Sequence, residues 1–97
     1  MAYYETVVLE IVKARLNRLA FDTSLDDYLK KRIKAADEEL SRIGIKLKAG
    51  NVDDEMLLAD YVVWRYQNRD QNTGMPEWLK LARRERWLKE RVVDDIG

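Results

Sequence analysis

The sequence predicts an all-α domain of four helices in which the third helix is central and buried. Four segments carry apolar residues at helical spacing, and loop signals separate them. The third segment, residues 56–64, holds a single charge, Asp60, and its apolar residues occupy more than one side of a helix. A surface helix has one apolar stripe, so the other three segments are expected to cover this one. Ninety-seven residues is the size of one ordinary domain, and a single domain over residues 1–97 is therefore predicted.

The first helix is predicted over residues 7–19. Apolar residues recur through this range at helical spacing: Val8, Val12, Leu16 and Leu19. Thr6 can cap the segment. Tyr3 and Tyr4 are adjacent, so one helix face cannot bury both of them. Residues 1–6 are therefore expected to form a flexible N-terminal arm.

The second helix is predicted between an acidic loop at Asp22 and a glycine at position 44. It has the longest apolar stripe in the chain: Leu25, Tyr28, Leu29, Ile33, Ala36, Leu40 and Ile43. Ser24 is followed three residues later by Asp27, which is the spacing of a capping box. Gly44 lies where the left-handed residue that ends a helix belongs.

A short extended or strand-like loop is predicted between the second and third helices. Apolar and charged residues alternate there before a Gly50-Asn51 turn: Ile45, Lys46, Leu47 and Lys48. The chain contains no second strand pattern, so an extended segment here would have to pair with a neighbouring copy.

The third and fourth helices each have a start signal. Asn51 or Asp53 is expected to cap the third helix, which ends near Asp70. Pro76 suits the first turn of the fourth helix, and residues 92–97 are expected to fray. The apolar stripe of the fourth helix is Trp78, Leu81, Ala82, Leu88 and Val92. The predicted core of the domain is Leu29, Ile33, Ala36, Leu40, Leu57, Leu58, Tyr61, Val62 and Leu81.

The composition excludes several kinds of site. Cysteine and histidine are absent, which removes disulfides, thiol nucleophiles, structural zinc and the usual acid–base residue at neutral pH. Lys plus Arg equals Asp plus Glu at 18 each, so net charge directs the chain toward neither nucleic acid nor an anionic membrane. No signal peptide and no apolar run of about 20 residues is found. A cytosolic protein without enzyme activity, cofactor or metal is expected.

The acidic residues give no pattern typical of catalysis. Adjacent residues on a helix do not face each other, so three adjacent pairs are not expected to form a site: Asp26-Asp27, Asp53-Asp54 and Asp94-Asp95. Two of these pairs lie in first helical turns, where acids are expected as caps and as complements of the helix dipole. Asp60 is unusual because it lies in the apolar centre of the third helix. It is expected either on a solvated side or paired with Arg65 or with a basic residue of another segment.

Residues 80–91 form the strongest candidate surface. They hold six basic residues against two acidic ones, with Trp78 and Trp87 interleaved. Arginine beside exposed aromatic rings can grip a nucleic-acid backbone and stack bases. The same residue types dominate protein–protein interfaces, and both interpretations stay open. The two tryptophans are nine positions apart, about half a turn out of phase, so one of them is expected outside the core.

The order of these features resembles the small head–tail connector proteins of long-tailed bacteriophages, the head-completion adaptors beneath the portal. The matching features span residues 8–91. The first half contains KARLN at residues 13–17, the acidic loop at Asp22 and SLDDYLKKRIKAADEELSRIGI at residues 24–45. The second half contains Tyr66, Asn68 and Arg69, which stand in place of a frequent Tyr-x-Asn-Arg motif, and then a helix that begins at Met75-Pro76.

The resemblance implies a non-enzymatic virion subunit, assembled in the host cytoplasm as a ring of about a dozen copies. The ring would dock on the portal protein and offer a platform to a stopper or tail-completion protein, with DNA passing through its hole. The C-terminal helix would face the portal or a neighbouring subunit through Trp78, Arg83, Arg84, Trp87 and Arg91. The loop would face the next component through Ile45, Lys46, Leu47, Lys48 and Asn51. The alternative is a small helical nucleic-acid-binding or regulatory protein that uses its basic C-terminal helix.

Overall fold

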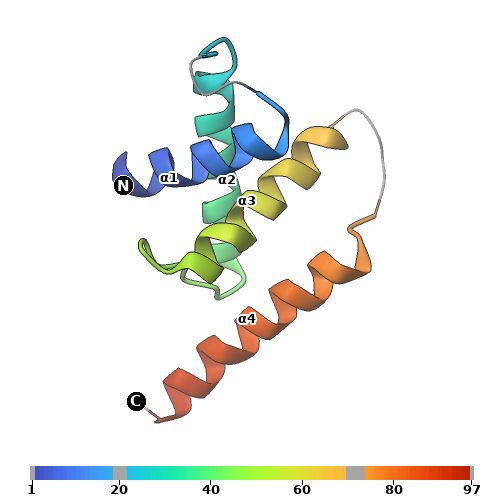
Figure 1. The fold of residues 1–97 in the computed structure, drawn as a ribbon. Coiled ribbons are helices and arrows are strands. Elements are labelled where there is room, and N and C mark those ends of the chain that lie inside the picture. The colour runs from blue at the N-terminus through green and yellow to red at the C-terminus, as the bar shows by residue number, and fades with distance from the viewer. Residues whose placement is uncertain (1, 19–21, 70–73, 97) are drawn as a thin grey trace.

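The computed structural model describes residues 2–18, 22–69 and 74–96, and these ranges contain four helices and no strand (Figure 1). The helices are α1 (Ala2–Arg15), α2 (Asp26–Arg42), α3 (Val52–Gln67) and α4 (Glu77–Ile96). The predicted all-α class with four helices is confirmed.

The four helices are not packed equally. α3 packs against α1, α2 and α4, and α1 and α2 also pack against each other. Among the described residues, α3 is the one helix against which α4 packs, and α4 runs as a long arm on one side of the molecule (Figure 1). The molecule is accordingly flattened and elongated, with extents of 44 × 32 × 18 Å.

The core lies where α1, α2 and α3 meet. Its buried residues include Val8, Val12, Leu29, Ile33, Ala36, Leu40, Ile45, Leu57, Leu58, Tyr61, Val62 and Leu79. Leu81, which was predicted for the core, is 51% exposed, whereas Leu79 is fully buried. Residues that are two positions apart in a helix point in directions that differ by about 200° around the helix axis. The rotation that buries Leu79 therefore exposes Leu81.

Both ends of the chain are more helical than expected. α1 begins at Ala2, so residues 2–6 are helical where a flexible arm was expected, and Thr6 lies inside the helix instead of capping it. α4 continues to Ile96, through the region expected to fray. The adjacent tyrosines restrict burial but not helix formation, and extending an existing helix avoids the cost of nucleation. Leu19 and Asp70, the predicted ends of two helices, lie outside the described residues.

The N-caps predicted for α2 and α3 have different outcomes. The Asn51 side chain accepts a hydrogen bond from the Asp54 N–H at 3.1 Å, which confirms Asn51 as the cap of α3. The capping box of α2 is wrong, because that helix starts without a side-chain cap. The Ser24 hydroxyl and N–H instead donate to Asp22 Oδ1 at 2.7 and 3.1 Å, which forms a local turn before the helix.

The end of α2 is closed by a Schellman motif. Gly44 adopts a φ of 98°, as predicted for the left-handed position. Its N–H donates to the Ser41 carbonyl at 3.0 Å, and the Ile45 N–H donates to the Leu40 carbonyl at 2.9 Å. A Cβ atom at Gly44 would lie 2.6 Å from Nη2 of Arg91 in α4. Glycine is therefore required both by the backbone and by the approach of α4.

Gly44→Ala is expected to destabilise the chain more than Gly50→Ala. Both residues have positive φ, so each substitution introduces strain of about 1–2 kcal/mol. Nothing lies within 4 Å of a Cβ atom at Gly50, whereas Arg91 must move when Gly44 is replaced. Urea denaturation of both variants measures the difference. Equal losses would contradict a role for the Arg91 contact.

The loop of residues 45–51 is irregular and is held by carboxylates of the same chain. The Lys48 N–H donates to Asp54 Oδ2 at 2.9 Å, and the Gly50 N–H donates to Glu55 Oε2 at 3.2 Å. The Lys46 N–H donates to Glu90 Oε1 at 3.0 Å. These amides are therefore already satisfied within one copy of the chain.

Candidate interaction surface

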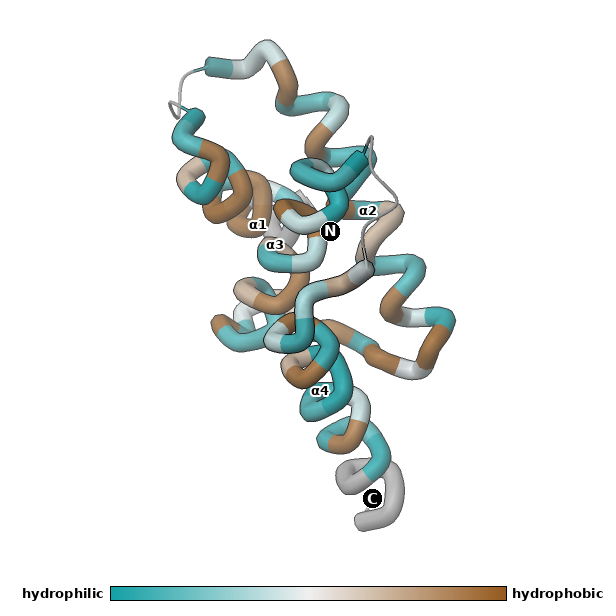
Figure 2. The backbone as a smooth tube through the Cα atoms, turned by 90° about the vertical axis from the view of Figure 1, so that its right-hand side faces the viewer, coloured by the Kyte–Doolittle hydropathy of each residue, from teal (hydrophilic) through white to brown (hydrophobic). Residues whose placement is uncertain are grey.

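α4 is attached to the rest of the molecule by an apolar contact near its start and by polar contacts further along. Leu79 is fully buried and Ala82 packs against the core. Figure 2 shows that α4 is largely hydrophilic along the rest of its described length. The distal half of the helix is therefore held mainly by hydrogen bonds and ion pairs.

Arg86 makes the most connected of these contacts. Its Nε donates to Asp54 Oδ1 at 2.7 Å, its Nη2 to the Lys46 carbonyl at 2.8 Å, and its Nη1 to Glu90 Oε1 at 3.0 Å. The Asp54 side chain is only 3% exposed and that of Arg86 is 14% exposed. The hydrogen bond to Asp54 is the main cause that raises the pKa of Arg86. One guanidinium thus joins α3, the loop and α4.

The contact between Arg86 and Asp54 was not predicted, although the sequence contains a pattern that points to it. Asp54 was explained by the helix dipole, which is a sufficient reason for an acid in a first turn. Arg86 lies four and seven positions after Ala82 and Leu79, on the same face of α4. A charge that continues a buried stripe requires a buried partner, and this rule would have pointed to an acid on another helix.

The titration of Glu90 is expected to reveal its contact with the Lys46 N–H and with Arg86. The N–H of Lys46, followed by the Arg86 guanidinium, holds the pKa of Glu90 below its ordinary value of 4.5. The stabilisation is therefore present above pH 4.5 and is lost as the pH falls through the lower, folded-state pKa. The amide NMR resonance of Lys46 should shift at a pH below 4.5. It should not shift in Glu90→Gln, and a wild-type midpoint at or above 4.5 would contradict the contact.

Trp87 and Arg91 attach α4 to the end of α2. The Trp87 indole N–H donates to the Ile43 carbonyl at 3.0 Å, and Arg91 Nη2 donates to the Gly44 carbonyl at 3.1 Å. The Arg91 guanidinium also lies 4.8 Å from the centre of the Trp87 ring. Trp87 is nevertheless 36% exposed and Trp78 is 51% exposed, so neither tryptophan belongs to the core.

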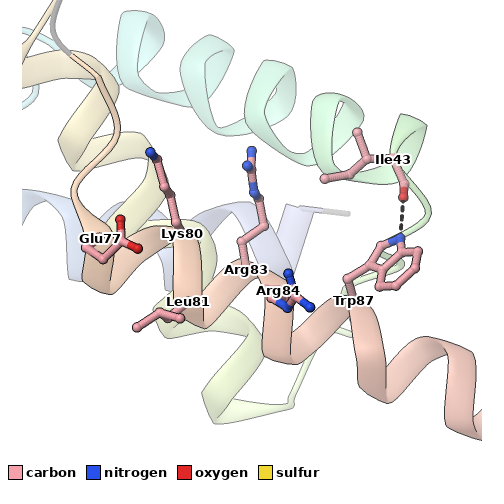
Figure 3. A pocket seen from close by; sticks show the side chains of 7 residues that line it. All are labelled: Ile43, Glu77, Lys80, Leu81, Arg83, Arg84 and Trp87. Carbon is pink, nitrogen blue, oxygen red and sulfur yellow. Dashed lines mark hydrogen bonds between the residues drawn. The ribbon is translucent and has the colours of Figure 1, made fainter.

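A pocket of about 480 Å³ lies between α4 and the end of α2 (Figure 3). Its lining residues are Ile43, Glu77, Lys80, Leu81, Arg83, Arg84 and Trp87. In Figure 3 the side chains of Lys80 and Arg83 extend from α4 toward α2. The structure therefore brings together three of the predicted surface residues, Arg83, Arg84 and Trp87, whereas Trp78 and Arg91 do not line this pocket.

The three cations of this pocket have no partner in the described part of the chain. Most arginines of the chain form an ion pair, a side-chain hydrogen bond or a ring contact. Within the described part of the chain, Arg83 and Arg84 form none, and neither does Lys80. Their charges therefore remain available to another molecule.

Of the loop residues that were predicted to face another component, some are buried and the others are exposed. Ile45 is fully buried and Leu47 packs against the core, so Ile45 does not face another component as expected. Lys46, Lys48 and Asn51 are exposed. The alternation of apolar and charged residues separates an inward side of the loop from an outward side, without a strand.

Asp60 pairs with Arg15 of α1. This is the predicted pairing with a basic residue of another segment. Arg65, the other candidate, pairs instead with Glu39 of α2 at 2.6 Å. These two ion pairs join α3 to its neighbouring helices.

The described residues contain no group of three or more carboxylates placed to hold a metal ion. Within the same ranges, no helix combines the length and the hydrophobicity needed to span a membrane.

No family model, curated protein or solved structure matches this chain. The resemblance to head–tail connectors therefore stays a prediction.

Proposed function

We propose that this chain is a non-enzymatic structural subunit and that α4 is its main contact with other proteins. The observation that supports this proposal is the combination of exposed apolar residues and unpaired cations on α4. Trp78, Leu81 and Leu88 are all exposed on α4, which in the described ranges packs against no helix other than α3. Clustered apolar side chains on the surface of a soluble protein mark sites of protein interaction.

The assembly that we propose is the ring of a phage head–tail connector, in the virion between the portal and a stopper or tail-completion protein. A ring contact joins two different patches on each subunit. One patch would be the outer face of α4, and the other would be the exposed side of the loop at Lys46, Lys48 and Asn51. The loop, extended and strand-like in this proposal, would face the next component.

In this proposal α3 is the central helix that fixes the two patches relative to each other. Asp54 and Glu55 bind the loop amides, and Asp54 also binds Arg86 of α4. DNA would pass through the ring, and a net charge of zero suits a conduit that must not retain it.

Light scattering on the purified chain, alone and with the portal protein of the same genome, tests this proposal. A ring-sized species is expected, and Arg83→Glu/Arg84→Glu should abolish docking on the portal while the helical circular-dichroism signal stays intact. Lys31→Glu/Lys34→Glu is the matched control, because both lysines are exposed on α2, away from the pocket. A chain that stays monomeric and ignores the portal would refute the connector role.

A nucleic-acid-binding role is the second candidate, and the unpaired Lys80, Arg83 and Arg84 favour it. It predicts binding to DNA or RNA with an affinity that falls steeply as salt is added. Flat titrations at low salt would remove this candidate.

A further inference from the structure

We propose that the pocket between α4 and the end of α2 binds an acidic protein segment that carries an apolar side chain. The inference rests on the proposed function, because it names the chemistry of the partner at the surface through which the chain would join an assembly.

The charges around the pocket call for an acidic occupant. Lys80, Arg83 and Arg84 line it against one acid, Glu77, and none of the three cations has a partner in the described part of the chain. Arginine forms two parallel hydrogen bonds with a carboxylate, so Arg83 and Arg84 are suited to acidic side chains. A partner segment with two or more carboxylates would neutralise this excess.

The apolar part of the pocket calls for an apolar side chain on the same segment. Ile43, Leu81 and Trp87 line the pocket, and all three are substantially exposed. Within the described residues α2 and α4 are not packed side by side, and they meet through the hydrogen bonds of Trp87 and Arg91 to the end of α2. The space between them can therefore admit a side chain from outside, in the manner of a peptide docked in a groove between helices.

A protein segment fits this pocket better than a nucleic acid does. Stacking of bases requires a free aromatic face, and Arg91 already lies against the Trp87 ring. The indole N–H of Trp87 is also engaged, by the Ile43 carbonyl.

The test uses a fluorescently labelled acidic peptide of about four helical turns, with leucine at every third or fourth position among glutamates. Its fluorescence anisotropy is titrated with the full chain, with Arg83→Glu/Arg84→Glu and with the control Lys31→Glu/Lys34→Glu. The charge-reversed variant should bind at least about tenfold more weakly, and the control should bind like the wild type. Leu81→Ser, and a peptide with serine in place of leucine, should each weaken binding several-fold.

Circular dichroism of each variant shows that it is folded, so that a loss of binding can be assigned to the pocket. Equal binding by the wild type and the charge-reversed variant would overturn the inference. So would binding of a single-stranded oligonucleotide in place of the peptide.

The inference and the proposed function can fail separately. A chain that forms rings with the portal, but whose charge-reversed variant still docks and whose wild type ignores the peptide, would overturn the inference alone. A chain that binds the peptide at this pocket but never joins an assembly would support the inference and overturn the connector role.

Discussion

An Arg86→Met variant is expected to lose about 3–5 kcal/mol of stability, the range found when one partner of a buried ion pair is removed. The Asp54 carboxylate would stay buried with the Lys48 N–H as its remaining donor from the loop. The Lys46 carbonyl and Glu90 would lose their guanidinium contacts as well. A domain of this size has a total stability of about 5–15 kcal/mol, so urea denaturation should show a large decrease in the midpoint.

The control for Arg86→Met is Arg84→Met, which removes an exposed arginine from the same helix and should change stability by less than about 0.5 kcal/mol. The double variant Arg86→Met/Asp54→Asn should lose less than the sum of the two single variants, because the second change relieves an unpaired buried charge. A loss below about 1 kcal/mol for Arg86→Met would show that water screens the pair, as in an ordinary surface salt bridge.

Leu79→Ala is expected to cost about 2–5 kcal/mol, whereas Leu81→Ala should be nearly neutral for stability. Leu79 is fully buried, and it is the only residue of α4 within the described side chains that is. Its removal would leave a cavity at the point where α4 meets the core. Leu81 is half exposed, so alanine there removes little of the packing that stabilises the fold.

Thermal and urea denaturation of the two leucine variants give the measurement, because the residues are matched in type and lie two positions apart. Comparable losses from both variants would mean that the rotation of α4 described above is wrong. A stable Leu81→Ala variant with weakened binding of the acidic peptide would separate the role of this face from that of the core.

The features that the sequence predicted correctly depend on residues close together in the chain. Gly44 ends α2 in a left-handed conformation and Asn51 caps α3, and both signals lie within four residues of their effect. The predicted core residues of α2 and α3 are buried, because a helical period is a local property, whereas Tyr28 and Ile43 of the predicted α2 stripe are exposed.

The features that it failed to predict depend on contacts between distant segments. Arg86 meets Asp54 across 32 positions and Lys46 across 40. The sequence showed several acids and several arginines, but no local rule selects one pair among them. The inward face of α4 depends likewise on how this helix meets α3, and its stripe alone allowed Leu81 to be placed inside.

In the described part of the chain, α3 is the one helix against which α4 packs, and this arrangement has a consequence for the dynamics of the molecule. Local opening free energies in proteins range from near zero up to the global value, and cooperative units with few apolar contacts open first. Among its described side chains, α4 has one fully buried apolar anchor, Leu79 near its start. We therefore expect α4 to exchange its amide hydrogens as a separate unit while the other helices remain protected. A partner that binds α4 while it is packed on α3 would slow this exchange. Hydrogen-exchange mass spectrometry therefore measures directly whether α4 is bound by a partner.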